Sequence, residues 1–416
     1  MFLGVAETRA CAAILTTLPR PTCTAQSGIV RYLPEHNIAA EDAPMGDTLP
    51  KFTAAAVQAS PIFLDRDATV DKACDLILEA GRNGAQLIVL PETWIPGYPF
   101  WHTTPGVFSG DTFLELWKNS VEIPSASTSQ IGQAAKQAGA YVVVGINERD
   151  TVTRGTLYNT LLYFAPTGEI MHRHRKLMPT FTERTIWGFG DGSDLDVMET
   201  PLGRLGGLIC WEHEMTLAKY ALYAQGEQVH CAVWPAYSSQ NNHIDFGTRQ
   251  YAFEGACFVV SACGVVAPGA MPEHLGGDKT PANGGSAIIG PNGEYLAGPV
   301  YDVETILYAE IDLDAAIKEK HARDVAGHYA RPDVLQLIVN AAHKPVAVFS
   351  DTASHAEEPL ESATAEEVVD RLEAVRDYLG SLIERIETDG DMEVNEALAE
   401  AMASIDMAAT GMWSRE

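Results

Sequence analysis

Short apolar runs alternate with amphipathic segments from residue 52 to about residue 340. The apolar runs predict β-strands at Thr53–Gln58, Gln86–Leu90, Tyr141–Ile146, Asn159–Phe164, Leu205–Cys210, Val229–Trp234, Cys257–Ala262, Ser286–Ile289 and Ile306–Ile311. Several runs are apolar at successive positions, which is typical of strands covered on both faces. Helical stripes lie between them, at Val70, Cys74, Ile77 and Leu78 after Asp67, and at Ile131, Ala134, Ala135 and Ala138. The pattern predicts an α/β fold.

Two turn signals refine this prediction. Pro166-Thr-Gly168 and Pro291-Asn-Gly293 each follow an apolar run and have the composition of hairpin connections. Hairpins join antiparallel strands, so we expect a mixed sheet and not a purely parallel one.

Changes in composition divide the chain into four parts. We expect an N-terminal extension at 1–50, one α/β domain at 51–345, a linker at 346–363 and an acidic helical tail at 364–416. The run from Ala10 to Leu18 faintly resembles a targeting peptide, but an untargeted extension, or a true start nearer Met45, fits better because no clear cleavage site follows.

The tail carries a helical seam. Thr364 and Glu367 have capping-box spacing, and apolar residues follow at alternating steps of four and three: Val368, Leu372, Val375, Leu379, Leu382 and Ile386. A single helix cannot bury such a seam alone. It docks on the main domain, pairs with another subunit, or forms only a marginal helix.

The charge excludes some partners. The chain has a formal net charge of -28, and residues 357–416 hold 17 acidic and 4 basic residues, or -13. Nucleic acids and anionic lipids both need a basic footprint, so we expect neither as a partner. No run is long enough to span a bilayer. The scattered cysteines, with no C-x-x-C pair among them, indicate free thiols in a reducing compartment, and we expect a cytoplasmic protein.

Candidate chemistry stands where predicted strands end. Glu92 follows the run ending at Leu90, and Cys210 closes the run from Leu205. Strand carboxyl ends line the ligand crevice of open α/β sheets, where burial would raise the pKa of Glu92 and suit it to act as a base. At Cys210, a tight turn into a helix would aim amides at an oxyanion and favour the thiolate. A solvated glutamate and a buried structural cysteine remain the alternatives.

Lys176 and Glu183 form a second pair of candidates. Lys176 ends the basic stretch His172-Arg-His-Arg-Lys176, and Glu183 follows closely enough to orient it. A basic stretch is usually a solvated edge, but a lysine before Leu-Met-Pro179 can point inward as a fixed positive charge beside an anionic intermediate.

Glu92, Lys176 and Cys210, in this order, resemble the Glu-Lys-Cys triad of the nitrilase, or carbon–nitrogen hydrolase, superfamily. The surrounding strings resemble its true nitrilase branch: Pro91-Glu92, Ile95-Pro-Gly-Tyr-Pro99, Lys176-Leu-Met-Pro-Thr-Phe-Thr-Glu-Arg184, Trp187-Gly-Phe-Gly-Asp-Gly192, Cys210-Trp-Glu-His213 and Gly327-His-Tyr-Ala-Arg-Pro-Asp333. The likeness covers about residues 52–340. Both extensions and part of the loop from Trp101 to Thr128 lie outside it.

The resemblance implies an α-β-β-α sandwich that becomes four-layered when two subunits pair through helices near Cys210. It implies that Cys210 attacks a nitrile carbon, Glu92 acts as the base, and Lys176 stabilises charge with the amide of Trp211. Glu183 would hold Lys176. Because cysteine supplies the nucleophile, neither a metal nor an organic cofactor is expected.

Aromatic residues are the candidates for contact with the substrate: Trp211, Tyr98, Trp187 and Trp234, with Trp94, Phe100 and Trp101 as further members of the group after Glu92. His213, three positions after Cys210, could approach the thiolate. Since Glu92 already supplies the base, we expect His213 to make structural hydrogen bonds instead.

Two other functions remain open at the level of sequence. An amidase or carbamoylase of the same superfamily would share the triad, and ammonia release from amides against nitriles would separate them. A catalytically silent self-assembling protein would tolerate thiol alkylation with no turnover to lose. Among nitrilases, the sequence does not choose between aromatic, arylacetic and aliphatic nitriles and cyanide.

The tail yields a prediction about assembly. We expect a homo-oligomer larger than a dimer, in the manner of the open spirals built by true nitrilases, with the tail helix docked by its seam and its acidic face outward. Deleting the residues after Ser350 should change particle size or stability more than it changes catalysis, and the size should depend on salt. Light scattering of both proteins at low and high salt, beside an ammonia assay, tests this. Unchanged mass, stability and salt response would show that the seam is idle.

Overall fold

The alternation of buried faces along each strand builds two sheets that pack against each other. The computed structural model describes residues 47–277, 282–344 and 347. The first sheet contains β1 (Lys51–Gln58), β2 (Ala85–Val89), β3 (Tyr141–Arg149), β4 (Leu157–Phe164), β5 (Ile170–Arg175) and β12 (Thr305–Asp312). The second contains β6 (Met198–Thr200), β7 (Gly203–Ile209), β8 (Val229–Trp234), β9 (Phe258–Cys263), β10 (Gly284–Ile289) and β11 (Tyr295–Tyr301).

Both sheets are mixed, and their strand orders are alike. The first runs β12-β1-β2-β3-β4-β5 and the second β11-β10-β9-β8-β7-β6. In the first, β1, β2 and β3 are parallel and β4 and β5 follow as antiparallel neighbours. In the second, β7, β8 and β9 are parallel and β6, β10 and β11 are antiparallel. The hairpins expected at Pro166-Thr-Gly168 and Pro291-Asn-Gly293 join β4 to β5 and β10 to β11, so the predicted mixed character is confirmed.

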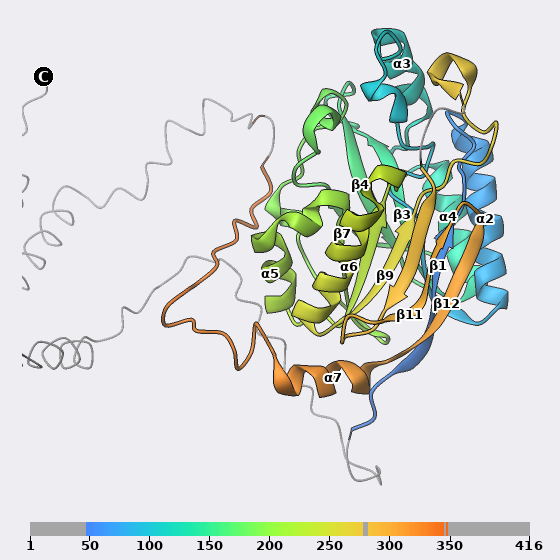
Figure 1. Ribbon diagram of the computed structural model, residues 1–416. Coiled ribbons are helices and arrows are strands. Elements are labelled where there is room, and N and C mark those ends of the chain that lie inside the picture. Colours follow the sequence, from blue (N-terminus) through green and yellow to red (C-terminus); the bar gives the residue numbers. More distant parts are fainter. Residues whose placement is uncertain (1–46, 278–281, 345–346, 348–416) are drawn as a thin grey trace, which may run out of the picture.

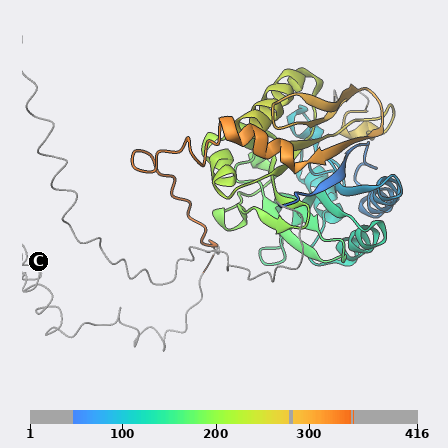
Figure 2. The ribbon, with the colours of Figure 1, turned by 90° about the horizontal axis from the view of Figure 1, so that it is seen from below.

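Helices cover the outer face of each sheet (Figure 1). On one side lie α2 (Arg66–Arg82) and α4 (Ala126–Ala138), and on the other α5 (Thr216–Ala224) and α6 (Asn241–Gly255). Two further helices, α3 (Gly110–Asn119) and α7 (Leu313–Ala322), lie at opposite ends of the sandwich. Viewed along the layers, the order is helices, sheet, sheet, helices (Figure 2). The α-β-β-α fold expected from the resemblance is therefore confirmed.

Alternation along the strands explains the layers. In β1, Ala54 and Ala56 face the other sheet, whereas Ala55 and Val57 face α2 and α4. In β7, Ile209 points between the sheets and its neighbour Leu208 points toward α5 and α6. These central strands are apolar on both faces because each sheet is covered on both faces.

Some elements differ from the sequence prediction for physical reasons. The run from Leu205 was expected to end at Cys210, but β7 ends at Ile209 because Cys210 adopts a positive φ of 52°. The strand β5 was not predicted because its sequence, Ile-Met-His-Arg-His-Arg, lacks an apolar run. The strand β11 contains a Gly-Pro step, which weakens the strand signal.

A glycine on β3 allows the Glu92 segment to lie against the sheet. A Cβ added to Gly145 would lie 2.2 Å from the carbonyl oxygen of Pro91 and 2.7 Å from the Cα of Glu92. In turn, the Gly145 amide donates to that Pro91 oxygen at 3.2 Å. The close approach fixes where the chain emerges from β2.

Residues 1–46 of the expected extension at 1–50, the expected linker at 346–363 except residue 347, and the acidic tail at 364–416 with its seam lie outside the described residues. Within the described part, no helix is both long and apolar enough to cross a membrane.

Candidate active site

The candidate catalytic side chains gather at one edge of the sandwich. Glu92 follows β2, and Lys176 follows β5, which runs parallel to β2. Cys210 follows β7 in the facing sheet, and its side chain shares a cavity with Glu183. The three residues therefore come from the carboxyl ends of strands, as the sequence indicated for Glu92 and Cys210.

Lys176 is fully buried between two carboxylates. Its Nζ donates to Oε1 of Glu92 at 3.0 Å and to Oε2 of Glu183 at 2.8 Å. Burial opposes the charge of the ammonium group, but Glu183 and Glu92 outweigh that penalty and raise the pKa of Lys176 well above its usual value. Lys176 is therefore a fixed cation.

Glu183 is held in place by its own turn. It lies in the 3₁₀ helix Phe181–Thr185, where its Oε2 accepts from the amide of Thr180 at 2.7 Å. Its Oε1 accepts from the hydroxyl of Tyr98 at 2.7 Å. Glu183 thus lies where it can orient Lys176, and its hydrogen bond from Tyr98 connects that side chain to the same cluster.

Glu92 has the environment of a base. Burial raises the pKa of Glu92 and the charge of Lys176 lowers it. Burial outweighs the charge, so the pKa of Glu92 is raised to about 7. Its Oε1 also accepts from Nδ2 of Asn159 at 2.6 Å, whereas no described residue donates to its buried Oε2. One carboxylate oxygen is thus anchored and the other is free to take a proton.

Cys210 stands on a strained turn. Its φ of 52° lies in the left-handed region, which is costly for a residue with a side chain. Burial, followed by the charge of Glu92, raises the pKa of its thiol, although Lys176 and a backbone hydrogen bond from Trp211 act against this. The expectation that the helix start after Cys210 favours the thiolate is wrong, because burial and the charge of Glu92 outweigh the Trp211 amide of the 3₁₀ helix Cys210–Glu214. The resting cysteine is a thiol.

Glu212 joins the two catalytic segments. Its Oε1 accepts from the amide of Leu177 at 2.7 Å, and its Oε2 accepts from the amide of Ile209 at 2.8 Å. Burial would raise the pKa of Glu212, but His174, whose Nε2 lies 3.0 Å from Oε2, and the two amides lower it. An ionised Glu212 therefore ties the residue after Lys176 to the residue before Cys210.

The cavity beside Cys210 has a volume of about 290 Å³. It is lined by Tyr98, His102, Thr103, Thr180, Phe181, Thr182, Glu183, Cys210, Trp211, Pro235, Tyr237, Ser239 and Gln240. The aromatic side chains and the few polar groups are typical of a site for a small molecule.

Two of the four aromatic candidates line this cavity. Tyr98 and Trp211 do, but Trp187 and Trp234 do not. The indole N–H of Trp187 donates to Oδ1 of Asn147 at 2.9 Å, and the ring of Trp234 stacks on His213 at 4.7 Å. Both indoles therefore serve the packing around the site.

Asn159, Phe181 and Tyr237 were not singled out from the sequence. Tyr237 follows β8, so the strand-end signal that pointed to Glu92 and Cys210 could have found it. Asn159 stands near the start of β4, where it reaches Glu92 only because β4 runs antiparallel to β3. That pairing is not visible in the sequence.

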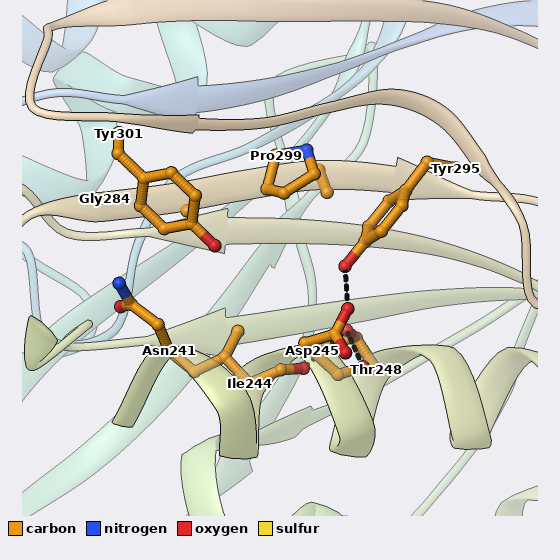
Figure 3. A pocket seen from close by; sticks show the side chains of 10 residues that line it. Asn241, Ile244, Asp245, Thr248, Gly284, Tyr295, Pro299 and Tyr301 are labelled. Carbon is orange, nitrogen blue, oxygen red and sulfur yellow. Dashed lines mark hydrogen bonds between the residues drawn. The ribbon is translucent and has the colours of Figure 1, made fainter. Parts of the chain in front are cut away.

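A second cavity, between α6, β10 and β11, is far smaller (Figure 3). Its volume of about 10 Å³ is near the least that holds one water molecule. The hydroxyl of Tyr295 points across it and donates to Asp245. It contains no catalytic candidate and marks the packing of α6 on the sheet.

Comparisons with known proteins agree with this geometry. The carbon–nitrogen hydrolase family model matches residues 53–319. An aliphatic nitrilase of Rhodococcus rhodochrous is 44% identical over 308 residues, which are 70% of this chain and 83% of that protein. A bifunctional nitrilase/nitrile hydratase of Nicotiana tabacum is 42% identical over 340 residues, 75% of this chain and 93% of that protein.

A solved structure supports the fold. Nit3 of Saccharomyces cerevisiae, a member of branch 10 of the nitrilase superfamily, superposes with a TM-score of 0.57 at 23% identity, covering 67% of this chain and 96% of that one. The chain belongs to the carbon–nitrogen hydrolase family. Its curated relatives at about 40% identity place it among the nitrilases.

The surroundings of Glu92 yield a prediction about pH. The hydrogen bond from Asn159 lowers the pKa of Glu92, so Asn159→Leu should raise it. Because the base must be ionised, activity falls as pH decreases through this pKa, and the acid limb of kcat/KM should move to higher pH in the variant.

Thr160→Val is a matched control, since Thr160 is the next residue of β4 but its hydroxyl donates to Glu148. Its acid limb should stay at the wild-type position. An acid limb that is unmoved, or moved to lower pH, in Asn159→Leu would show that Glu92 is not the titrating base.

Proposed function

We propose that this chain hydrolyses an organic nitrile with two waters to a carboxylic acid and ammonia, through a covalent intermediate on Cys210. The observation that carries the proposal is the buried cluster in which Lys176 bridges Glu92 and Glu183 beside a strained cysteine. The names of the curated relatives support a nitrile over an amide as the substrate.

In the proposed reaction, Oε2 of Glu92 accepts the thiol proton as the sulfur attacks the nitrile carbon, and the proton then passes to the nitrile nitrogen, which gives a thioimidate. Addition of a water gives a tetrahedral intermediate, and its charge is stabilised by Lys176 and the Trp211 amide. Ammonia then leaves an acyl-thioester. A second water, activated by Glu92, releases the acid and restores the thiol.

A substrate screen tests the proposed activity. Ammonia, acid and amide are measured for aromatic, arylacetic and aliphatic nitriles and cyanide, with the matching amides as controls. Amide is measured because one relative is named as both a nitrilase and a nitrile hydratase. Turnover of amides alone would replace the proposal with an amidase.

Variants of the triad test the roles of the residues. Cys210→Ala should abolish turnover while the fold survives, and intact-mass spectrometry with a slow substrate should find an adduct on Cys210. Glu92→Gln and Lys176→Met should each lose on the order of a hundredfold or more in rate. An adduct on Cys231, Cys257 or Cys263, or about a tenth of wild-type activity in either charge variant, would contradict these roles.

We further propose that α5 and α6 form the face through which two such sandwiches pair as a dimer, within a larger homo-oligomer. Large apolar side chains on these outer helices are exposed, with Leu217 68% and Phe246 66% accessible. Apolar side chains gathered on one face are typical of an obligate interface. The edge of the sandwich that carries Cys210 would then lie close to the paired helices.

Charge on this face should break the dimer. Leu217→Asp and Phe246→Asp should each lower the particle mass in light scattering, because a carboxylate would be buried without a partner. Val152→Asp, at an apolar residue that is 82% accessible in the turn after β3, is the control and should keep the wild-type mass. A wild-type mass in both helix variants would place the interface elsewhere.

We also propose a cytoplasmic location, because the described cysteines, Cys74 and four buried thiols, are all free. Cell fractionation followed by thiol labelling tests this. Recovery from an oxidising compartment, or of a disulfide-linked form, would contradict it.

A further inference from the structure

A buried chain of polar side chains ends on the backbone of Cys210. Nδ1 of His213 lies 2.6 Å from the carbonyl oxygen of Cys210, and its Nε2 lies 3.0 Å from Nε2 of His230. Nδ1 of His230 lies 2.7 Å from Oε1 of Glu227, whose Oε2 accepts from the hydroxyl of Tyr251. The triad chemistry uses none of these groups.

The whole chain is shielded from water. His213, His230, Glu227 and Tyr251 are each at most 1% exposed. Stacked rings cover it, with Trp234 on His213 and Tyr251 on His230. Buried polar groups in such a place must all be satisfied by one another.

The acceptor at one end fixes the direction of every hydrogen bond. A carbonyl oxygen can only accept, so Nδ1 of His213 carries a proton. Burial, and next the neighbouring His230, lower the pKa of His213 to about 3, so the ring is neutral and its Nε2 can only accept. Nε2 of His230 must therefore donate.

The same reasoning continues to Glu227. Burial lowers the pKa of His230 well below its usual value, so this ring is also neutral and its Nδ1 accepts. The atom facing Nδ1 is a carboxyl oxygen, which can donate only as a carboxylic acid. Burial raises the pKa of Glu227 to about 8, which agrees with a proton on that oxygen at neutral pH.

Two surrounding groups oppose this state, since the hydroxyl of Tyr251 and the charge of Lys320 lower the pKa of Glu227, but burial outweighs both. Groups that act on it come from every neighbouring layer: Tyr163 of β4, Tyr223 of α5, His230 and Cys231 of β8, Tyr251 of α6, Cys257 before β9, and Lys320 of α7. Among these described groups Lys320 is the cation, and its own partner is Asp324 at 3.6 Å.

The fold leaves room for this carboxyl group. A Cβ added to Gly206 of β7 would lie 2.1 Å from Oε1 of Glu227. Glycine at that position thus allows the acid to lie against the strand that leads into Cys210. Cys210, whose φ is 52°, directly follows the carboxyl end of the same strand.

We propose that Glu227 is a neutral carboxylic acid that starts a one-directional hydrogen-bond chain through His230 and His213 to the Cys210 carbonyl, and that this chain positions the nucleophile. The proposal rests on the proposed role of Cys210. Glu227 touches no reacting atom, so it is a positioning residue. Its proton is required because it defines which nitrogen of each histidine donates.

Glutamine and leucine at position 227 give opposite expectations. The amide of Gln can donate to His230 and accept from Tyr251, as the neutral acid does, so Glu227→Gln should retain kcat near the wild-type value. Leucine can do neither. Glu227→Leu should lose kcat on the order of a hundredfold, with little change in KM, because a misplaced nucleophile affects the reaction more than binding.

The pH profile separates this role from simple packing. In wild type, kcat should fall as pH rises through about 8, where Glu227 loses its proton and can no longer donate. Glu227→Gln cannot titrate and should keep its activity at that pH. The acid limb, set by Glu92, should be the same in both proteins.

The outcomes distinguish this proposal from the proposed function. Absence of a Cys210 adduct in wild type would overturn the nucleophile itself. An adduct in wild type, with Glu227→Gln folded but as inactive as Glu227→Leu, or with an unchanged alkaline limb, would overturn only the neutral acid.

Neutron diffraction of the wild-type protein decides the point even if the variants do not fold. It should find hydrogen on Oε1 of Glu227, on Nε2 of His230 and on Nδ1 of His213. Hydrogen on both nitrogens of His230 beside an ionised Glu227 would overturn the proposal.

Discussion

Burial of Lys176 between Glu92 and Glu183 is the constraint on which the rest of the site depends. Removing an ion from water costs several kcal/mol unless close partners compensate, and both carboxylates are needed to hold this ammonium group. With two carboxylates around one cation, the cluster favours an additional proton. Burial is the largest cause of the pKa of about 7 at Glu92 and of the raised pKa of the Cys210 thiol, and the surplus carboxylate charge raises both further. The base and the nucleophile thus owe their protonation to the same buried cluster.

Holding such a cluster requires rigid attachments from both sheets. The first sheet contributes Glu92 and Lys176, and the second contributes Cys210. Glu212 spans the gap, with one oxygen on the amide of Leu177 and the other on that of Ile209. In addition, His213 of the hydrogen-bond chain through His230 contacts the carbonyl oxygen of Cys210. A strained backbone conformation such as that of Cys210 persists only where the surrounding contacts hold it in place. The hydrogen bonds of Glu212 and of the histidine chain provide such contacts.

The order of sheets and helices follows largely from hydrophobic pattern. Runs such as Val229–Trp234 are buried at every position, and strands of this kind must be covered on both faces. The strand-end rule located Glu92 and Cys210 for the same reason, since the carboxyl ends of parallel strands share an edge. The strand-end rule failed for β5, because the basic sequence of this strand lacks an apolar run. The role of Lys176 was therefore expected only from the resemblance to a family.

The sequence by itself determined the α/β class and the mixed strand pairing, because local pattern carries that information, and its resemblance to the carbon–nitrogen hydrolases gave the layered fold, the candidate triad and the kind of chemistry. Only the tertiary structure decided which partners each group meets. Asn159 reaches Glu92 through antiparallel pairing, Trp187 turns to Asn147 and away from the cavity, and Glu227 meets His230 beside a glycine of another strand. Protonation states depend on burial and on such distant neighbours, which no run of adjacent residues encodes.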